Sequence, residues 1–224
     1  MIIFISLIFL GLSMFAQWRL RSKFKKYSLT PLANGMSGEE IARRMLADNH
    51  ISDVRVMSVE GQLSDHYNPA DKTVNLSQDV FYGRNAAAAA VAAHECGHAV
   101  QHADAYAMLN FRSAMVPVLN ASSKFMPWLI FGGVMLLSTT PIPLMIGIVL
   151  FAITTIFSFI TLPVEFDASR RALAWLDTRS IVTKDELVMS KDALWWAAST
   201  YVIAALSSLA TLIYYLGILN SRRD

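Results

Sequence analysis

Two histidines and a glutamate lie in one short run of the chain, His94-Glu95-Cys96-Gly97-His98, which matches the pattern H-E-x-x-H. On a helix, residues four apart lie one above the other on the same face. Two imidazoles at this spacing can therefore bind one zinc ion, at about 2.0–2.1 Å each. Glu95 lies at the edge of that face, where its carboxylate can reach a metal-bound water without binding the metal.

Zinc bound in this way lowers the pKa of its water to about 7 and supplies a nucleophile at neutral pH. We expect Glu95 to accept the proton of that water and to deliver it to the leaving amine, as general base and then general acid. The pattern predicts a metalloendopeptidase with one Zn2+ per chain. Cys96 is two residues from either histidine, so it points to nearly the opposite side of the helix and is expected to be a small buried residue.

A catalytic zinc ion needs a third protein ligand and an open position for water. The best candidate is Glu165, which directly follows the second arm of a predicted membrane hairpin and so returns to the side of the catalytic helix. Asp104, ten residues after His94, is a weaker alternative. Asp167 could orient one histidine by accepting its free ring N–H.

The other histidines of the polar region are weaker candidates for the site. His102 shares the face of His98, but the rise of the helix carries it about 12 Å from His94. It is therefore expected to lie near the site or at the surface. His50 is placed in the soluble part, and His66 is expected in a turn.

The composition indicates a membrane protein, since 54% of the 224 residues are hydrophobic and only 16% are charged. Apolar blocks of about twenty residues are long enough to cross a bilayer. We expect a mainly α-helical membrane protein with about four transmembrane helices and a small α+β peptidase domain. The predicted segments are an anchor at 1–20, a soluble part at 27–112, a transmembrane hairpin at 113–162, a polar helical segment at 163–194 and a last transmembrane helix at 195–219.

Within the soluble part, four elements are expected. Ser37 and Glu40 have the spacing of a capping box at the start of a helix over 37–49. Residues 54–59 and 72–77 have the character of short strands. The alanine-rich run 85–108 predicts a long helix that carries the two histidines. The strand at 72–77 is our candidate for the sheet edge that pairs with an extended substrate.

Basic residues follow the first span and recur between 170 and 191, which places both stretches on the cytoplasmic side of a cell-membrane protein. Arg222 and Arg223 would fall on the other side, which is contrary to the positive-inside rule. The single cysteine excludes an internal disulfide. No basic patch with interleaved aromatics is present, so we expect protein or peptide substrates and a lipid bilayer, not nucleic acid, as partners. The oligomeric state is left open.

The segments AAHECGHAVQ, LSDHYNP, NLS and LPVEFDASRRA, together with the hairpin, resemble the YugP-like neutral zinc metallopeptidases. Their order is also similar to that of the integral-membrane gluzincins, which include the heat-shock membrane protease HtpX and the CAAX prenyl proteases. The resemblance implies a gluzincin fold in which His94, His98 and Glu165 bind zinc and Glu95 is the acid/base. Those relatives usually carry E-x-x-A-D, whereas here Ser169 takes the place of the aspartate, and Asp167 is its candidate substitute.

Two other functions fit a chain of this kind. One is a catalytically inactive membrane scaffold or regulator with a zinc site, although structural zinc sites are usually four-coordinate and rich in cysteine. The other is a transporter or channel subunit. The predicted spans carry almost no ionisable residue beyond Lys124, whereas such charges usually mark transport pathways.

Overall fold

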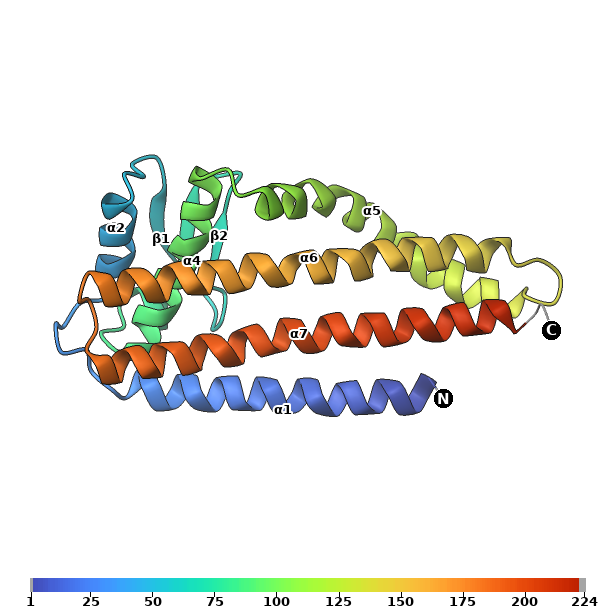
Figure 1. Cartoon of the computed structure of the whole chain (residues 1–224), viewed down its shortest axis with the longest axis horizontal. Coiled ribbons are helices and arrows are strands. Elements are labelled where there is room, and N and C mark those ends of the chain that lie inside the picture. Colours follow the sequence, from blue (N-terminus) through green and yellow to red (C-terminus); the bar gives the residue numbers. More distant parts are fainter. Residues whose placement is uncertain (1, 222–224) are drawn as a thin grey trace. The chain divides into compact units, whose positions relative to one another are not determined.

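The computed structural model describes residues 2–221, which are mostly helical and include one small sheet (Figure 1). The elements in chain order are α1 (Ile2–Ser28), α2 (Gly38–Asp48), β1 (Arg55–Val59), β2 (His66–Asn68), β3 (Thr73–Ser77), α3 (Gln78–Phe81), α4 (Ala86–Ala103), α5 (Ala107–Met135), α6 (Ile142–Thr178) and α7 (Lys184–Asn220). Arg222 and Arg223, the two basic residues that do not fit the expected orientation, lie outside the described part of the chain.

Three helices within residues 2–221 are long and apolar enough to cross a membrane, namely α1, α6 and α7. The fourth expected span corresponds to α5, the first arm of the predicted hairpin. Its helix contains Arg112, Lys124 and two internal prolines, Pro117 and Pro127. These residues and their polar neighbours interrupt the apolar run, so three candidate spans are found where four were expected.

The chain forms two compact units, and α1, α5, α6 and α7 contribute to both. The first unit comprises the described residues of 1–15, 110–162 and 200–224. The second comprises 16–109 and 163–199, and it includes the sheet, α2, α3 and α4. All the candidate site residues belong to this second unit.

The sheet has the strand order β1-β3-β2, so β3 is its central strand. β1 pairs with β3 in parallel, with Val56 opposite Val74, and β2 pairs with it antiparallel, with Tyr67 opposite Val74. The prediction that residues 72–77 form a substrate-binding edge is therefore wrong. The error arose because β2 was taken for a turn, whereas its three residues pair along the side of β3 that we expected to be free.

The core of the second unit packs α2 and the sheet around α4. The predicted capping box is confirmed: Ser37 Oγ accepts from the Glu40 N–H, and the Glu40 carboxylate accepts from the Ser37 N–H. The alanines at the start of α4 are almost completely buried, which lets neighbouring elements approach its backbone closely. α4 ends at Ala103, earlier than predicted, and Ala105 then adopts a positive φ of 51°.

Two helices are longer than the sequence pattern indicated. α6 continues without interruption from the apolar second arm of the hairpin into the polar segment, through Pro163 and Glu165, and ends at Thr178. α7 likewise begins in polar sequence at Lys184 and extends through the last apolar block. The change from apolar to polar composition occurs along these helices and does not mark a break in the backbone.

Candidate metal centre

Two imidazoles from α4 and one carboxylate from α6 meet in the second unit. His94 Nε2 lies 3.3 Å from Glu165 Oε2, and His98 Nε2 lies 3.6 Å from the same oxygen. Four tetrahedral ligands at about 2.0–2.1 Å from one ion are separated by about 3.3 Å from each other, which is close to these distances. Among the residues described, these three form the group of side chains that could hold a metal ion.

Gly97, between the two histidines on α4, lies close against the backbone of Ala168 on α6. A Cβ atom at this position would lie 2.6 Å from the backbone oxygen of Ala168 and 3.1 Å from its Cα atom. A backbone contact of this kind cannot be relieved by rotating a side chain. The absence of a side chain at Gly97 therefore allows α6 to bring Glu165 within reach of both imidazoles.

The second nitrogen of each imidazole contacts a polar side chain. His94 Nδ1 lies 3.1 Å from Ser169 Oγ on α6. His98 Nδ1 lies 3.0 Å from Gln101 Oε1, one turn further along α4. Both Nε2 atoms are thus left to face Glu165. Burial by itself would lower the pKa of His98, but the hydrogen bond and the charge of Glu165 outweigh it, so the pKa is raised.

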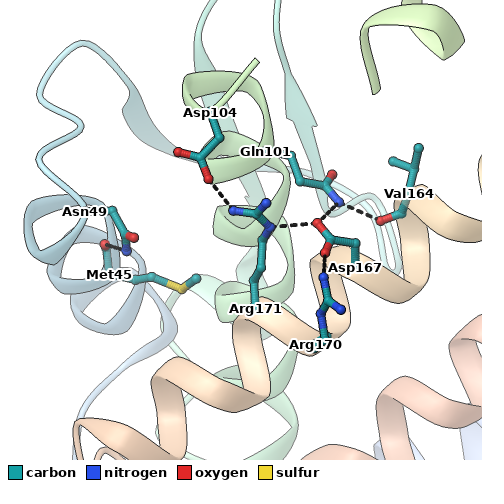
Figure 2. A network of polar contacts seen from close by, with 8 residues as sticks. All are labelled: Met45, Asn49, Gln101, Asp104, Val164, Asp167, Arg170 and Arg171. Atoms are coloured by element: carbon teal, nitrogen blue, oxygen red, sulfur yellow. Dashed lines mark hydrogen bonds and ion pairs between the residues drawn. The ribbon is translucent and has the colours of Figure 1, made fainter. Parts of the chain in front are cut away.

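Gln101 connects the imidazole of His98 to α6, and Figure 2 shows its contacts with Val164 and Asp167 on that helix. Its amide nitrogen Nε2 donates to the Val164 carbonyl at 2.8 Å and to Asp167 Oδ2 at 2.9 Å. The residue is completely buried. Asp167, which we expected to orient a histidine directly, therefore contacts the amide of Gln101 and reaches His98 through it.

Two arginines of α6 surround the Asp167 carboxylate (Figure 2). Arg171 Nε donates to Asp167 Oδ2 at 2.6 Å, and Arg170 pairs with Oδ1. Arg171 also pairs with Asp104 through its Nη1 atom, at 2.5 Å. Asp104, the alternative third ligand, is exposed at the C-cap of α4 and belongs to this ion-pair network, not to the cluster of possible ligands.

Glu95 is buried beside the cluster, and one of its carboxylate oxygens is held by the sheet. Its Oε2 accepts a hydrogen bond of 2.9 Å from the backbone N–H of Tyr67, in β2. The Tyr67 hydroxyl contacts His102 Nδ1 at 2.7 Å. His102 thus interacts with β2, next to the site, and lies outside the cluster.

The remaining sequence candidates lie away from the cluster. Cys96 is fully buried and its thiol contacts the Ala42 carbonyl of α2 at 3.5 Å, as expected for a packed side chain. Burial raises the pKa of this thiol, which disfavours the thiolate that a metal would need. His50 and His66 are exposed, and His66 lies in β2 instead of the expected turn.

Three contacts of the site were not predicted from the sequence, namely those of Tyr67 with Glu95, Gln101 with His98, and Ser169 with His94. Gln101 carried a usable signal, because it follows His98 by three residues and so shares its side of the helix. The partnership of Ser169 with His94 is set by the register of α6 against α4, which no local pattern reports. The short strand β2 gave no alternation long enough to be recognised.

The fold and the site describe a helical protein with candidate membrane spans and a buried two-histidine, one-glutamate cluster that could hold a metal ion. The model of the family described as "Putative neutral zinc metallopeptidase" matches residues 1–220, and the chain belongs to that family. A relative from Bacillus subtilis (strain 168), described as "Putative membrane protease YugP", is 43% identical over 222 residues, covering 99% of this chain and 98% of the relative. No solved structure matches the chain.

Proposed function

We propose that the protein is a zinc-dependent metalloendopeptidase of the gluzincin type that hydrolyses peptide bonds next to a membrane. The observation that carries this proposal is the convergence of His94, His98 and Glu165, whose possible ligand atoms all lie within 4.8 Å of one another. Buried Glu95 lies beside them. The two imidazoles and one carboxylate are the donor set of a catalytic zinc site that keeps one position open. The likeness to HtpX and the CAAX prenyl proteases is part of the same proposal.

In this proposal each residue has a separate task. A bound zinc ion would supply a water of lowered pKa and polarise the scissile carbonyl. His94 and His98 offer Nε2, and Glu165 offers Oε2. Glu95 accepts the proton of the attacking water and passes it to the leaving amine. The Tyr67 N–H holds one oxygen of Glu95 in place, so the carboxylate keeps its orientation before the proton arrives.

The substrate is proposed to be a protein or peptide segment that enters the site in an extended form. An edge strand offers unpaired backbone groups to such a segment. β2 is an edge strand of the sheet and lies against α4 beside Glu95. We therefore propose β2, in place of residues 72–77, as the strand next to which the substrate backbone lies.

Removal of the metal tests the proposed function directly. Purified protein in detergent is expected to contain about one zinc per chain and to cleave a casein-type substrate. A chelator should abolish cleavage, and zinc added afterwards should restore it. Metal analysis and the rate of cleavage are measured on the same samples. Wild-type protein that binds zinc but cleaves no substrate under any of these conditions would favour the inactive scaffold instead.

We further propose a multi-pass cell-membrane protein in which α5 is a fourth span and the catalytic unit faces the cytoplasm. The support is the basic flank after the first span, Arg19 to Lys26. A reporter that is active only in the cytoplasm, fused after residue 112, is expected to be active. Activity of an exported reporter at that position would reverse the orientation, and a fusion after residue 138 serves as the matched control of opposite sign.

A further inference from the structure

We propose that Gln101, held by Asp167, fixes the tautomer of His98 and thereby prepares its Nε2 atom to bind zinc. This inference rests on the proposed function and adds a positioning role for two residues that bind neither metal nor substrate. The inference follows from the hydrogen-bonding roles of the groups around Gln101, because some of these groups can accept a hydrogen bond but cannot donate one.

The hydrogen-bond partners of Gln101 on α6 set the orientation of its side-chain amide. A glutamine side chain has one end that donates, NH2, and one that accepts, the oxygen. A backbone carbonyl and an ionised carboxylate can only accept. The partners on the α6 side are the Val164 carbonyl at 2.8 Å and Asp167 Oδ2 at 2.9 Å. The NH2 end must therefore face α6.

The orientation of the Gln101 amide determines which ring nitrogen of His98 carries the hydrogen. With its NH2 end fixed, Gln101 presents its oxygen to His98 Nδ1, at 3.0 Å. An oxygen without a proton requires a donor, so Nδ1 must carry the hydrogen. A neutral imidazole then has its lone pair on Nε2, the atom 3.6 Å from Glu165 Oε2. Because Asp167 can only accept hydrogen bonds, it helps to orient the Gln101 amide. That amide in turn determines that the lone pair of His98 lies on Nε2, the atom that would bind zinc.

Burial makes this arrangement obligatory. Gln101 is 0% exposed and His98 is 7% exposed, so bulk water does not offer an alternative partner to either group. A buried amide that turned over would place its NH2 against His98 and its oxygen against Asp167, at the cost of unpaired polar groups. The pairing of Arg170 and Arg171 with Asp167 keeps an ionised carboxylate opposite the amide.

The two histidines differ in whether a neighbouring group fixes the tautomer of the imidazole. His94 Nδ1 contacts the hydroxyl of Ser169, which can either donate or accept. A hydroxyl can rotate to suit either tautomer. His98 has a fixed tautomer, whereas His94 does not, and the fixed one depends on the two acceptors of α6, the Val164 carbonyl and Asp167.

The test is Asp167→Asn in the full-length protein, because asparagine can donate as well as accept. The new side-chain NH2 at position 167 would donate to the oxygen of a turned-over Gln101, whose own NH2 would then face His98 Nδ1. Of the two acceptors on α6, only the Val164 carbonyl would still favour the original orientation. We expect zinc affinity, measured by competition with a chromophoric chelator, to fall about 10–100-fold, the usual effect of losing an outer partner of a metal-binding histidine. In metal-free protein, at a pH high enough to leave His98 neutral, the ring 15N shifts of His98 should move from the Nδ1–H towards the Nε2–H tautomer.

Two further variants separate this role from general destabilisation. Asp104→Asn makes the same chemical change one step further along the network, at the ion pair with Arg171, and should leave zinc affinity within about twofold of wild type. The double variant Gln101→Glu with Asp167→Asn exchanges donor and acceptor. The amide introduced at position 167 can donate to the carboxylate introduced at position 101, and that carboxylate still accepts from His98, although the Val164 carbonyl loses its donor. The double variant should recover part of the lost affinity.

The inference is overturned if Asp167→Asn binds zinc as wild type does, if its His98 tautomer is unchanged, or if Asp104→Asn weakens binding equally. If Asp167→Asn does not fold, Gln101→Met takes its place, because methionine offers no acceptor of comparable strength to Nδ1–H; an unchanged His98 tautomer there has the same consequence. Wild-type protein that binds no zinc contradicts the proposed function instead, so the two failures are distinguishable.

Discussion

Glu95→Gln is expected to abolish peptide-bond hydrolysis while leaving zinc bound. Glutamine has nearly the shape of glutamate but cannot accept a proton from water. Its side-chain oxygen can still accept the Tyr67 N–H, which lies 2.9 Å from Glu95 Oε2, so the surroundings need not change. Loss of a general base costs about 10²–10⁴-fold in rate. Because Glu95 is not one of the three clustered residues, zinc occupancy should remain that of wild type.

The measurement is the rate of cleavage divided by the amount of bound zinc, for wild type, Glu95→Gln and Glu60→Gln. Glu60 is an exposed glutamate of the same unit, so its variant controls for the loss of a negative charge alone. Glu60→Gln should be as active as wild type. Unimpaired cleavage by Glu95→Gln would remove the proposed acid/base mechanism, even if zinc were bound as expected.

The part of the site that the sequence predicted well is the part that depends on one helix. The i, i+4 spacing of His94 and His98 becomes a shared face as soon as α4 forms, and alanine-rich sequence strongly favours that helix. Their ring centroids lie 4.8 Å apart. The predicted burial of Cys96 on the other side of α4 follows from the same periodicity.

Glu165 required a different kind of argument, since it is 67 positions from His98 in the sequence. It was chosen because a hairpin through the membrane returns the chain to its starting side. The structure brings Glu165 to the histidines along a continuous α6, and the approach depends on Gly97 against Ala168. Of the four expected spans, the one formed by α5 is not among the candidate spans of the described residues, because Pro117, Pro127 and Lys124 interrupt its apolar character.

Long-range pairing was not predictable from the sequence. β2 has three residues, too few for an alternating pattern, and it exists because β3 offers it hydrogen bonds. The contact between Tyr67 and Glu95 follows from that pairing. The same holds for the contact of Ser169 with His94. Such contacts depend on how elements pack, which one-dimensional patterns do not encode.

Glu165→Ala is expected to bind zinc much more weakly than wild type, and so to lose both metal and activity. The carboxylate is 4% exposed and its Oε2 faces both imidazoles, so no other side chain of the cluster replaces it. Two neutral imidazoles would remain where a catalytic zinc site needs three protein ligands. The loss of affinity should exceed the roughly 10–100-fold caused by removing an outer partner. Zinc content after dialysis, and affinity by chelator competition, measure it.

The matched control is Asp104→Ala, which removes the rival carboxylate. Asp104 pairs with Arg171 at the end of α4, so its loss should leave zinc occupancy unchanged. Thermal unfolding of all three proteins without metal separates a lost ligand from a lost fold, and Glu165→Gln, which preserves volume, covers the case in which alanine destabilises the buried site. If Glu165→Ala and Glu165→Gln keep full zinc occupancy while Asp104→Ala loses it, the third ligand comes from the end of α4 and not from α6. A folded Glu165 variant without zinc would instead show that the metal is held between the two helices.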